Sequence, residues 1–350
     1  MTRPSGRRPA PRGRLVSPLL AGMALVALAA AVPVAVIAPG PAVSAEADPL
    51  ATQEAQPVSI TDLTVAGPAR GAILDSPNRL GLPAVPVRAY EPEGAAWATL
   101  VWAHGGSFVH GTLDGPESDW VSRRFAEAGV RVYAVGYGVA SDSVKAPAPA
   151  NDVAAVLAWV AARTDGPIAV GGASAGGQLA VQAALQQADR ADADPLGVVR
   201  RADAVLLEYP TLHRVQQHDA TIAAATAGVI ERRRFSAERI AEMYDYYLGG
   251  AAEPADGSAN ANVVGELPAA RLAALPATVI VNADLDDLRA SGEQFAAQLR
   301  EAGVPVAESL QPGTDHGYLS RPQESPETDA AARETIERFV AELREIVAAR

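Results

Sequence analysis

The sequence predicts an α/β fold in which helices flank a mostly parallel central sheet of about eight strands. Short runs rich in Val, Ile and Leu alternate with helical patterns, and the later runs are almost continuously apolar. Continuous apolar strands are typical of parallel sheets, because helices cover both of their faces. Strands that alternate with helices also favour right-handed crossovers, and therefore parallel pairing.

The expected elements follow in chain order. We predict strands at 58–65, 85–91, 98–104, 130–136, 167–172, 202–209, 277–283 and 304–310. We predict helices at 117–129, 150–164, 175–189, 236–248, 288–302 and 327–348. No helical pattern separates the first two strands, so we expect them to form an antiparallel edge of the sheet.

One segment interrupts this alternation. About 70 residues without a strand pattern separate Tyr209 from Ala277, which is too long for a structureless loop in a compact domain. The segment contains several helical signals. We therefore predict a single domain at 57–350 that carries a small helical cap insertion at about 211–265.

The N-terminus has the pattern of an export signal. Five arginines precede a charge-free, largely apolar run from Leu15 to Ala45 that ends in small residues. This arrangement is typical of a secretory signal peptide. We predict a signal peptide at 1–45, a flexible leader at 46–56 and a secreted, extracellular protein. The alternative is an uncleaved membrane anchor that holds the folded domain outside the cytoplasm.

Composition restricts the partners of the protein. The formal net charge is −12 at pH 7, and such an acidic surface repels phosphate backbones, so we expect no nucleic-acid partner. A membrane contact is expected only through the N-terminal segment, and only if that segment is not cleaved. The chain has no cysteine, so disulfides are excluded and the fold depends on packing.

The glycine-rich stretch Gly172-Ala173-Ser174-Ala175-Gly176 lies between a predicted strand and a predicted helix. It matches G-x-S-x-G, the nucleophile elbow. In such a turn the serine has a strained backbone, and the flanking glycines pass so close to neighbouring elements that only very small residues fit. We predict that Ser174 is a nucleophile. The alternative is a flexible strand-to-helix turn.

A second motif, HGGSF, begins at His104 directly after a predicted strand. It resembles the HGGG-type loop, whose backbone N–H groups stabilise an oxyanion together with the residue after the nucleophile. We predict that Gly106, Ser107 and Ala175 donate these N–H groups. Gly105 would shape the loop, and His104 would hold its conformation. The alternative is an ordinary strand-to-helix loop.

A serine nucleophile needs a general base, and the chain has five histidines. His104 belongs to the HGGSF loop. His110, His213 and His218 lie beside polar or inserted segments and are expected at the surface or along a pocket. His316 follows the last predicted strand, at the sheet edge where ligands gather in open α/β folds. We predict that His316 is the base.

The base in turn needs a carboxylate that fixes its tautomer. Asp284, Asp286 and Asp287 follow the seventh predicted strand, and Asp315 adjoins His316. The three clustered aspartates could instead form a metal site, but no second ligand cluster accompanies them, so we predict no metal and no other cofactor. The chain order of serine, aspartate and histidine is that of the α/β-hydrolases.

With these motifs the chain resembles the hormone-sensitive-lipase-like esterases of the α/β-hydrolase superfamily, from about Val58 to the C-terminal helix. In that family HGGG precedes GDSAGG by roughly seventy residues, and the acid precedes the histidine by about thirty. Here His104 and Ser174 are 70 residues apart, and Asp286 and His316 are 30 apart. The resemblance therefore implies an α/β-hydrolase fold with Asp286 as the acid.

The resemblance also implies an activity, the hydrolysis of small-molecule carboxylic esters with short to medium acyl chains. Three positions depart from the family pattern: Ala173 replaces Asp, Ser107 replaces the third glycine of HGGG, and Asp287 replaces Pro. None of them removes a predicted catalytic group. Two alternatives stay open at this stage, namely cleavage of amides by the same residues, as in exopeptidases or deacetylases, and a non-catalytic ligand-binding homologue.

Overall fold

The computed structural model describes residues 57–67, 84–250 and 260–350. The predicted signal peptide at 1–45 and leader at 46–56 lie outside these residues. Among the residues that are described, no helix is long and apolar enough to cross a membrane.

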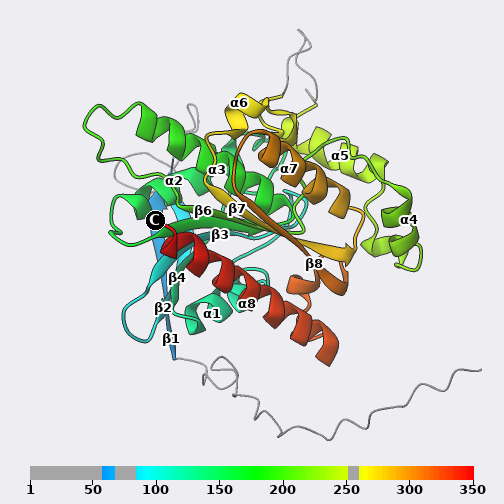
Figure 1. Cartoon of the computed structure of the whole chain (residues 1–350), viewed down its shortest axis with the longest axis horizontal. Helices are drawn as coiled ribbons and strands as arrows, with labels where there is room; N and C mark the ends of the chain where they lie inside the picture. Colours follow the sequence, from blue (N-terminus) through cyan, green and yellow to red (C-terminus); the bar gives the residue numbers. More distant parts are fainter. Residues whose placement is uncertain (1–56, 68–83, 251–259) are drawn as a thin grey trace, which may run out of the picture. The chain divides into compact units, whose positions relative to one another are not determined.

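The described residues form one eight-stranded sheet with the strand order β1-β2-β4-β3-β5-β6-β7-β8 (Figure 1). Its strands are β1 (Val58–Ala66), β2 (Ala84–Pro92), β3 (Ala98–Ala103), β4 (Val130–Val135), β5 (Ile168–Ala173), β6 (Ala204–Glu208), β7 (Ala277–Leu285) and β8 (Val306–Asp315). Strand β2 pairs antiparallel with β1 and β4, and all other pairings are parallel. The predicted mostly parallel sheet with an antiparallel edge is confirmed.

Helices cover both faces of the sheet (Figure 1). One face carries α1 (Asp119–Glu127) and α8 (Pro326–Ala348), and the other carries α2 (Ala148–Ala161), α3 (Ala175–Asp192) and α7 (Arg289–Glu301). The side chains of β3 alternate between the two cores, with Val101 on the α2–α3 side and Leu100 and Trp102 on the α1–α8 side. Both faces are therefore buried, which explains the apolar strands of the sequence.

The segment between β6 and β7 is helical in its described part. It contains α4 (Ala220–Thr226), α5 (Ala237–Leu248), α6 (Ala269–Leu272) and the 3₁₀ turns η1 (Glu231–Arg233) and η2 (Val264–Glu266). Helix α5 begins after Ser236, whose hydroxyl accepts a hydrogen bond from the N–H of Arg239, and ends at Gly249 in the left-handed conformation. Both ends therefore carry ordinary helix-capping residues.

Helix α5 packs directly on the HGGSF loop. The ring of Phe108 stacks on Tyr247 at a centroid distance of 4.1 Å and meets the edge of Tyr244 at 5.4 Å. The Tyr247 hydroxyl donates to Gln182 of α3, and the Tyr244 hydroxyl donates to the carbonyl of Thr211. The buried face of the amphipathic helix α5 thus holds it beside the ends of the central strands.

Candidate active site

Ser174 lies at the apex of the turn from β5 to α3, with φ of 52° and ψ of −119°. Its N–H donates to the carbonyl of Glu208, which leaves the side chain free to project from the turn. A Cβ atom at Gly172 would lie 2.5 Å from the Gly176 carbonyl carbon, and one at Gly176 would overlap the carbonyl oxygen of Ala103. Close backbone approach is therefore the reason why small residues surround this serine.

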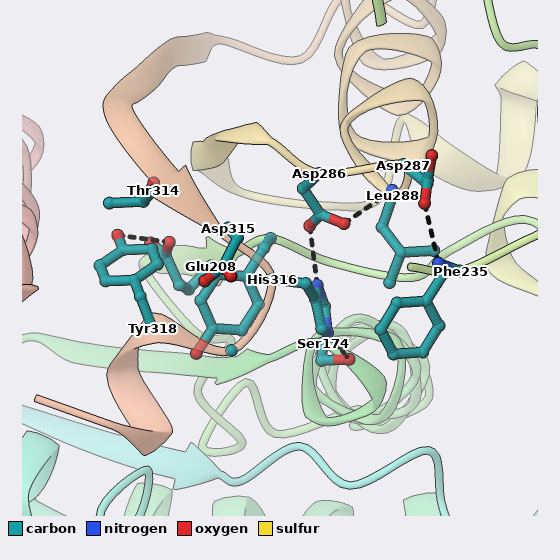
Figure 2. Close-up of polar contacts among 12 residues, drawn as sticks. Ser174, Glu208, Phe235, Asp286, Asp287, Leu288, Thr314, Asp315, His316 and Tyr318 are labelled. Atoms are coloured by element: carbon teal, nitrogen blue, oxygen red, sulfur yellow. Dashed lines mark hydrogen bonds and ion pairs between the residues drawn. The ribbon is translucent and has the colours of Figure 1, made fainter. Parts of the chain in front are cut away.

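The structure brings Ser174, His316 and Asp286 together in one hydrogen-bonded line (Figure 2). The serine Oγ lies 3.0 Å from His316 Nε2, and His316 Nδ1 lies 2.7 Å from Asp286 Oδ2. The other oxygen of Asp286 accepts the N–H of Leu288 at 3.0 Å. All three residues of the line are buried, with exposed fractions of 4%, 9% and 1%. The carboxylate is thus held where it can orient the imidazole.

Strand β8 delivers His316 to this position. The strand runs to Asp315, beyond the predicted end at residue 310. It pairs with β7 at Gln311 and again at Asp315, on either side of an irregularity at 312–314 that has no strand pattern in the sequence. The imidazole contacts the rings of Phe235 and Tyr209 in edge-on geometry, at centroid distances of 4.5 and 4.8 Å. Two aromatic rings and one carboxylate therefore restrict its orientation.

The aspartates near Asp286 have other partners. Asp287 accepts two hydrogen bonds from the guanidinium of Arg234, at 2.8 and 2.9 Å. It also accepts one from the N–H of Phe235 (Figure 2). Burial acts to raise the pKa of the Asp287 carboxyl, but these hydrogen bonds hold it below its usual value. Asp284 lies 3.5 Å from Arg289. In the described part of the chain, no group of acidic or histidine side chains has the arrangement of a metal site.

The HGGSF loop presents backbone N–H groups beside Ser174. Gly106 has φ of 116° and Ser107 has φ of 54°, so the chain turns sharply here. Within the described residues, the N–H groups of Gly106, Ser107 and Ala175 donate to no protein acceptor. The N–H of Gly105 differs, because it donates to Glu117. Three N–H groups at or near Ser174 are thus available to an acceptor on a ligand.

His104 lies beneath this loop and is buried. Its Nδ1 lies 2.7 Å from the carbonyl oxygen of Gly105, and its ring stacks on Tyr137 at 4.4 Å. The Tyr137 hydroxyl donates to the His104 carbonyl at 2.9 Å. Burial lowers the pKa of His104, so the imidazole stays neutral and serves as a hydrogen-bonding support of the loop.

Glu117 supports the same loop, and the sequence did not predict its role. Its carboxylate accepts the N–H of Gly105 at 2.8 Å and the hydroxyl of Tyr209 at 2.7 Å. The glutamate precedes α1, where acidic residues are common for electrostatic reasons alone. No motif in the sequence distinguishes it, since Tyr209 is 92 residues away along the chain.

The other histidines lie away from Ser174. His213 is buried, and its two ring nitrogens lie 3.0 Å from Ser291 Oγ and 3.1 Å from Gln298 Oε1. The prediction of a surface or pocket-lining position is therefore wrong for His213, because the insertion folds over it. His110 and His218 are exposed, as predicted.

A cavity of about 310 Å³ opens over Ser174 and His316. The HGGSF loop and Glu117 line it together with an arginine-rich wall made by Arg232, Arg233, Arg239 and Arg321. A hydroxyl bonded to an imidazole, a buried carboxylate behind it and free N–H donors in front of it are the parts that acyl transfer requires.

Comparisons with known proteins relate the chain to the α/β hydrolases. A profile of the alpha/beta hydrolase fold matches residues 100–320. The chain is 32% identical over 251 residues to carboxylesterase NlhH of Mycobacterium tuberculosis, covering 69% of this chain and 73% of that protein. It is 28% identical over 302 residues to carboxylic ester hydrolase LipN of the same organism, covering 83% and 72%.

Solved structures resemble the chain over a similar extent. The thermostable carboxylesterase EstE1, cloned from a metagenomic library, has a TM-score of 0.66 and 25% identity, covering 84% of this chain and 92% of its own. Brefeldin A esterase, a bacterial homologue of human hormone-sensitive lipase, has a TM-score of 0.68 and 21% identity, covering 86% and 80%. The chain belongs to the α/β-hydrolase family, and its relatives at 28 to 32% identity are carboxylic ester hydrolases.

Proposed function

We propose that this ester-hydrolysing enzyme cleaves small carboxylic esters through an acyl-enzyme, with Ser174 as nucleophile, His316 as general base and Asp286 as the residue that orients it. The observation that carries the proposal is the hydrogen-bonded line from Ser174 Oγ through both nitrogens of His316 to Asp286. It ends in a cavity that contains unpaired N–H donors.

In the first step, Ser174 Oγ attacks the ester carbonyl carbon and its proton moves to His316 Nε2. The carbonyl oxygen becomes an oxyanion, which the N–H groups of Gly106, Ser107 and Ala175 stabilise. Asp286 stabilises the imidazolium that forms. The fixed backbone donors need no reorganisation during this step, which is why they lower the barrier.

In the second step, the tetrahedral intermediate collapses and the alkoxide leaves with the proton from His316 Nε2. The acyl group stays bonded to Ser174 Oγ. Water then attacks this acyl-enzyme, with His316 again accepting the proton, and the carboxylic acid and free serine are released. The same three side chains therefore serve both halves of the reaction.

Two finer features belong to the proposal. The volume of the cavity, about 310 Å³, lies at the small end of ligand sites and favours short to medium acyl chains. The sequence pattern of residues 1–45 supports export, so the enzyme would act outside the cytoplasm. The N-terminal sequence of protein recovered from the culture medium tests the second feature.

The main experiment compares the wild type with Ser174→Ala on p-nitrophenyl acetate, p-nitrophenyl butyrate and the amide p-nitroacetanilide. We expect the variant to lose about 10⁶ in kcat on the esters, because the nucleophile is gone. A fluorophosphonate probe should label the wild type only, since it reacts with activated serines. Ser291→Ala is the matched control, because Ser291 also contacts a histidine but lies outside the cavity. Equal rates of ester cleavage in wild type and Ser174→Ala would refute the mechanism. If the wild type cleaves p-nitroacetanilide faster than the esters, the enzyme is an amidase.

A further inference from the structure

The segment from Glu231 to Arg239, which enters α5, has the sequence ERRRFSAER and contains four arginines. Two of them attach the insertion to the rest of the domain. Arg234 pairs with Asp287 at 2.8 Å, and Arg233 pairs with Asp315 at 2.8 Å. Their charges are therefore neutralised by two carboxylates that are adjacent in sequence to the proposed acid and base.

The other two arginines, Arg232 and Arg239, have no carboxylate partner among the described residues. One nitrogen of Arg239, Nη1, donates to the carbonyl of Arg234 at 2.6 Å and lies 3.4 Å from that of Arg232. Backbone carbonyls fix the guanidinium in place but do not neutralise its charge. The other two guanidinium nitrogens of Arg239, Nε and Nη2, donate to no protein acceptor in the part of the chain that the structure describes.

Arg239 lies next to the proposed catalytic residues. Its guanidinium lies over the ring of Phe235 at 4.1 Å, and that ring packs against the imidazole of His316 at 4.5 Å. One aromatic ring therefore separates a fixed cation from the proposed general base. Both Arg232 and Arg239 line the cavity that opens over Ser174.

The acidic side chains near the cavity do not neutralise these two arginines. Glu117 is the one carboxylate among the described residues that line it, and both of its oxygens already accept hydrogen bonds from Gly105 and Tyr209. Asp315 serves Arg233 and Arg321. The wall beside Ser174 thus carries excess positive charge, although the chain as a whole has a formal charge of −12.

We infer that this cavity binds esters that carry an ionised carboxylate in addition to the ester group. Arg239 and Arg232 would be the residues that recognise this carboxylate. This inference rests on the proposed esterase function. A planar guanidinium matches the two oxygens of a carboxylate, and charge-assisted hydrogen bonds of this kind are about twice as strong as neutral ones. Binding the distant carboxylate would place the ester carbonyl at Ser174 and exclude poorly oriented poses.

The experiment measures kcat/KM for matched pairs of charged and neutral esters. For an acyl-side charge the pair is monoethyl adipate and ethyl hexanoate, and for an alcohol-side charge it is 4-acetoxybenzoate and 4-acetoxybenzamide. The readout is the ratio of charged to neutral kcat/KM, compared between wild type and Arg239→Gln or Arg232→Gln, so that intrinsic ester reactivity cancels. We expect Arg239→Gln to lower this ratio about tenfold for at least one pair, which is the effect of one charge-assisted contact.

Arg163→Gln is the matched control, because Arg163 stacks on Trp159 at 4.6 Å in the same way but does not line the cavity. Its ratio should equal that of the wild type. A second measurement needs no variant: 4-hydroxybenzoate should inhibit hydrolysis of p-nitrophenyl butyrate more strongly than 4-hydroxybenzamide. If neutral esters are cleaved in a Ser174-dependent way while every ratio stays unchanged and the two inhibitors act equally, the inference is wrong and the esterase function stands. If no ester is cleaved, both are wrong.

Discussion

In the described part of the chain, two buried histidines lie within hydrogen-bonding distance of a serine hydroxyl, one at the cavity and one beneath the insertion. His316 Nε2 lies 3.0 Å from Ser174 Oγ, and His213 Nδ1 lies 3.0 Å from Ser291 Oγ. Each histidine is also bonded through its other ring nitrogen. The serine–histidine distances are therefore the same in the two regions. What distinguishes them is the residue bonded to the second ring nitrogen and whether the serine lines the cavity.

The third partner differs in charge. His316 is bonded to the carboxylate of Asp286, whereas His213 is bonded to the side-chain amide of Gln298. A carboxylate carries a full negative charge and stabilises the imidazolium that forms when a histidine accepts a proton more strongly than a neutral amide does. Burial lowers the pKa of His213 from an ordinary value of 6.5 to about 4. His213 therefore stays neutral where His316 has the partner that a base requires.

The two serines also differ in access and in backbone. Ser174 stands on a strained turn and lines the cavity beside free N–H donors. Ser291 lies inside α7, where its hydroxyl accepts the N–H groups of Leu212 and His213 at 2.8 and 3.2 Å. Its role is to satisfy the backbone at the start of the insertion. These differences in access and backbone favour Ser174 over Ser291 as the proposed nucleophile.

The largest expected effect is the contrast between His316→Gln and His213→Gln. We expect the first variant to lose about 10⁶ in kcat on p-nitrophenyl butyrate, because no base remains to activate Ser174. The second should keep its esterase activity and fluorophosphonate labelling, and lose about 1–3 kcal/mol of stability, since removing His213 leaves the buried Ser291 and Gln298 partly unpaired. Circular dichroism at the assay temperature checks that both variants are folded. Loss of labelling in folded His213→Gln would remove the distinction between the two regions.

A smaller effect is expected from the neighbouring carboxylates Asp286 and Asp287. Asp286→Asn should lower kcat by about 10⁴, because an amide in that position favours the wrong imidazole tautomer and no longer stabilises the imidazolium. Asp287→Asn removes the partner of Arg234 and should mainly reduce thermal stability and raise KM. Steady-state kinetics and thermal melts of both variants separate the two roles. A similar loss of kcat in both would contradict the assignment of Asp286.

The fold was largely predictable because its signals are local. Each of the eight strands has an apolar run, and each crossover helix has its own periodic pattern, so composition over short windows was sufficient. The end of β8 was missed for the same reason, since the stretch QPGTD at 311–315 has no apolar run and joins the strand through the pairing of Gln311 and Asp315 with β7. Pairing is a tertiary effect that local composition does not record.

The proposed site was predictable to the extent that its geometry depends on backbone sterics. Ser174 and the HGGSF loop could be found because tight turns demand small residues at fixed positions. The selection of Asp286 over its neighbours came from spacing within a family, since the three aspartates are alike in sequence. Glu117 and Phe235 could not be found, because each acts through a contact made across a distant part of the chain.

The smallest effect expected from the comparison is a pH-dependent loss of stability at His213. An unfolded chain protonates this histidine near pH 6.5, whereas the folded protein resists protonation until about pH 4. As the pH falls through this window the unfolded state binds more protons, so the free energy of unfolding decreases. We expect the wild type to lose about 2 kcal/mol more than His213→Gln between pH 7 and pH 4.5 in urea titrations. His110→Gln, which replaces an exposed histidine, should follow the wild type. Parallel loss in the wild type and His213→Gln would mean that His213 is protonated in the folded protein, and the electrostatic difference between the two serine–histidine pairs would then disappear.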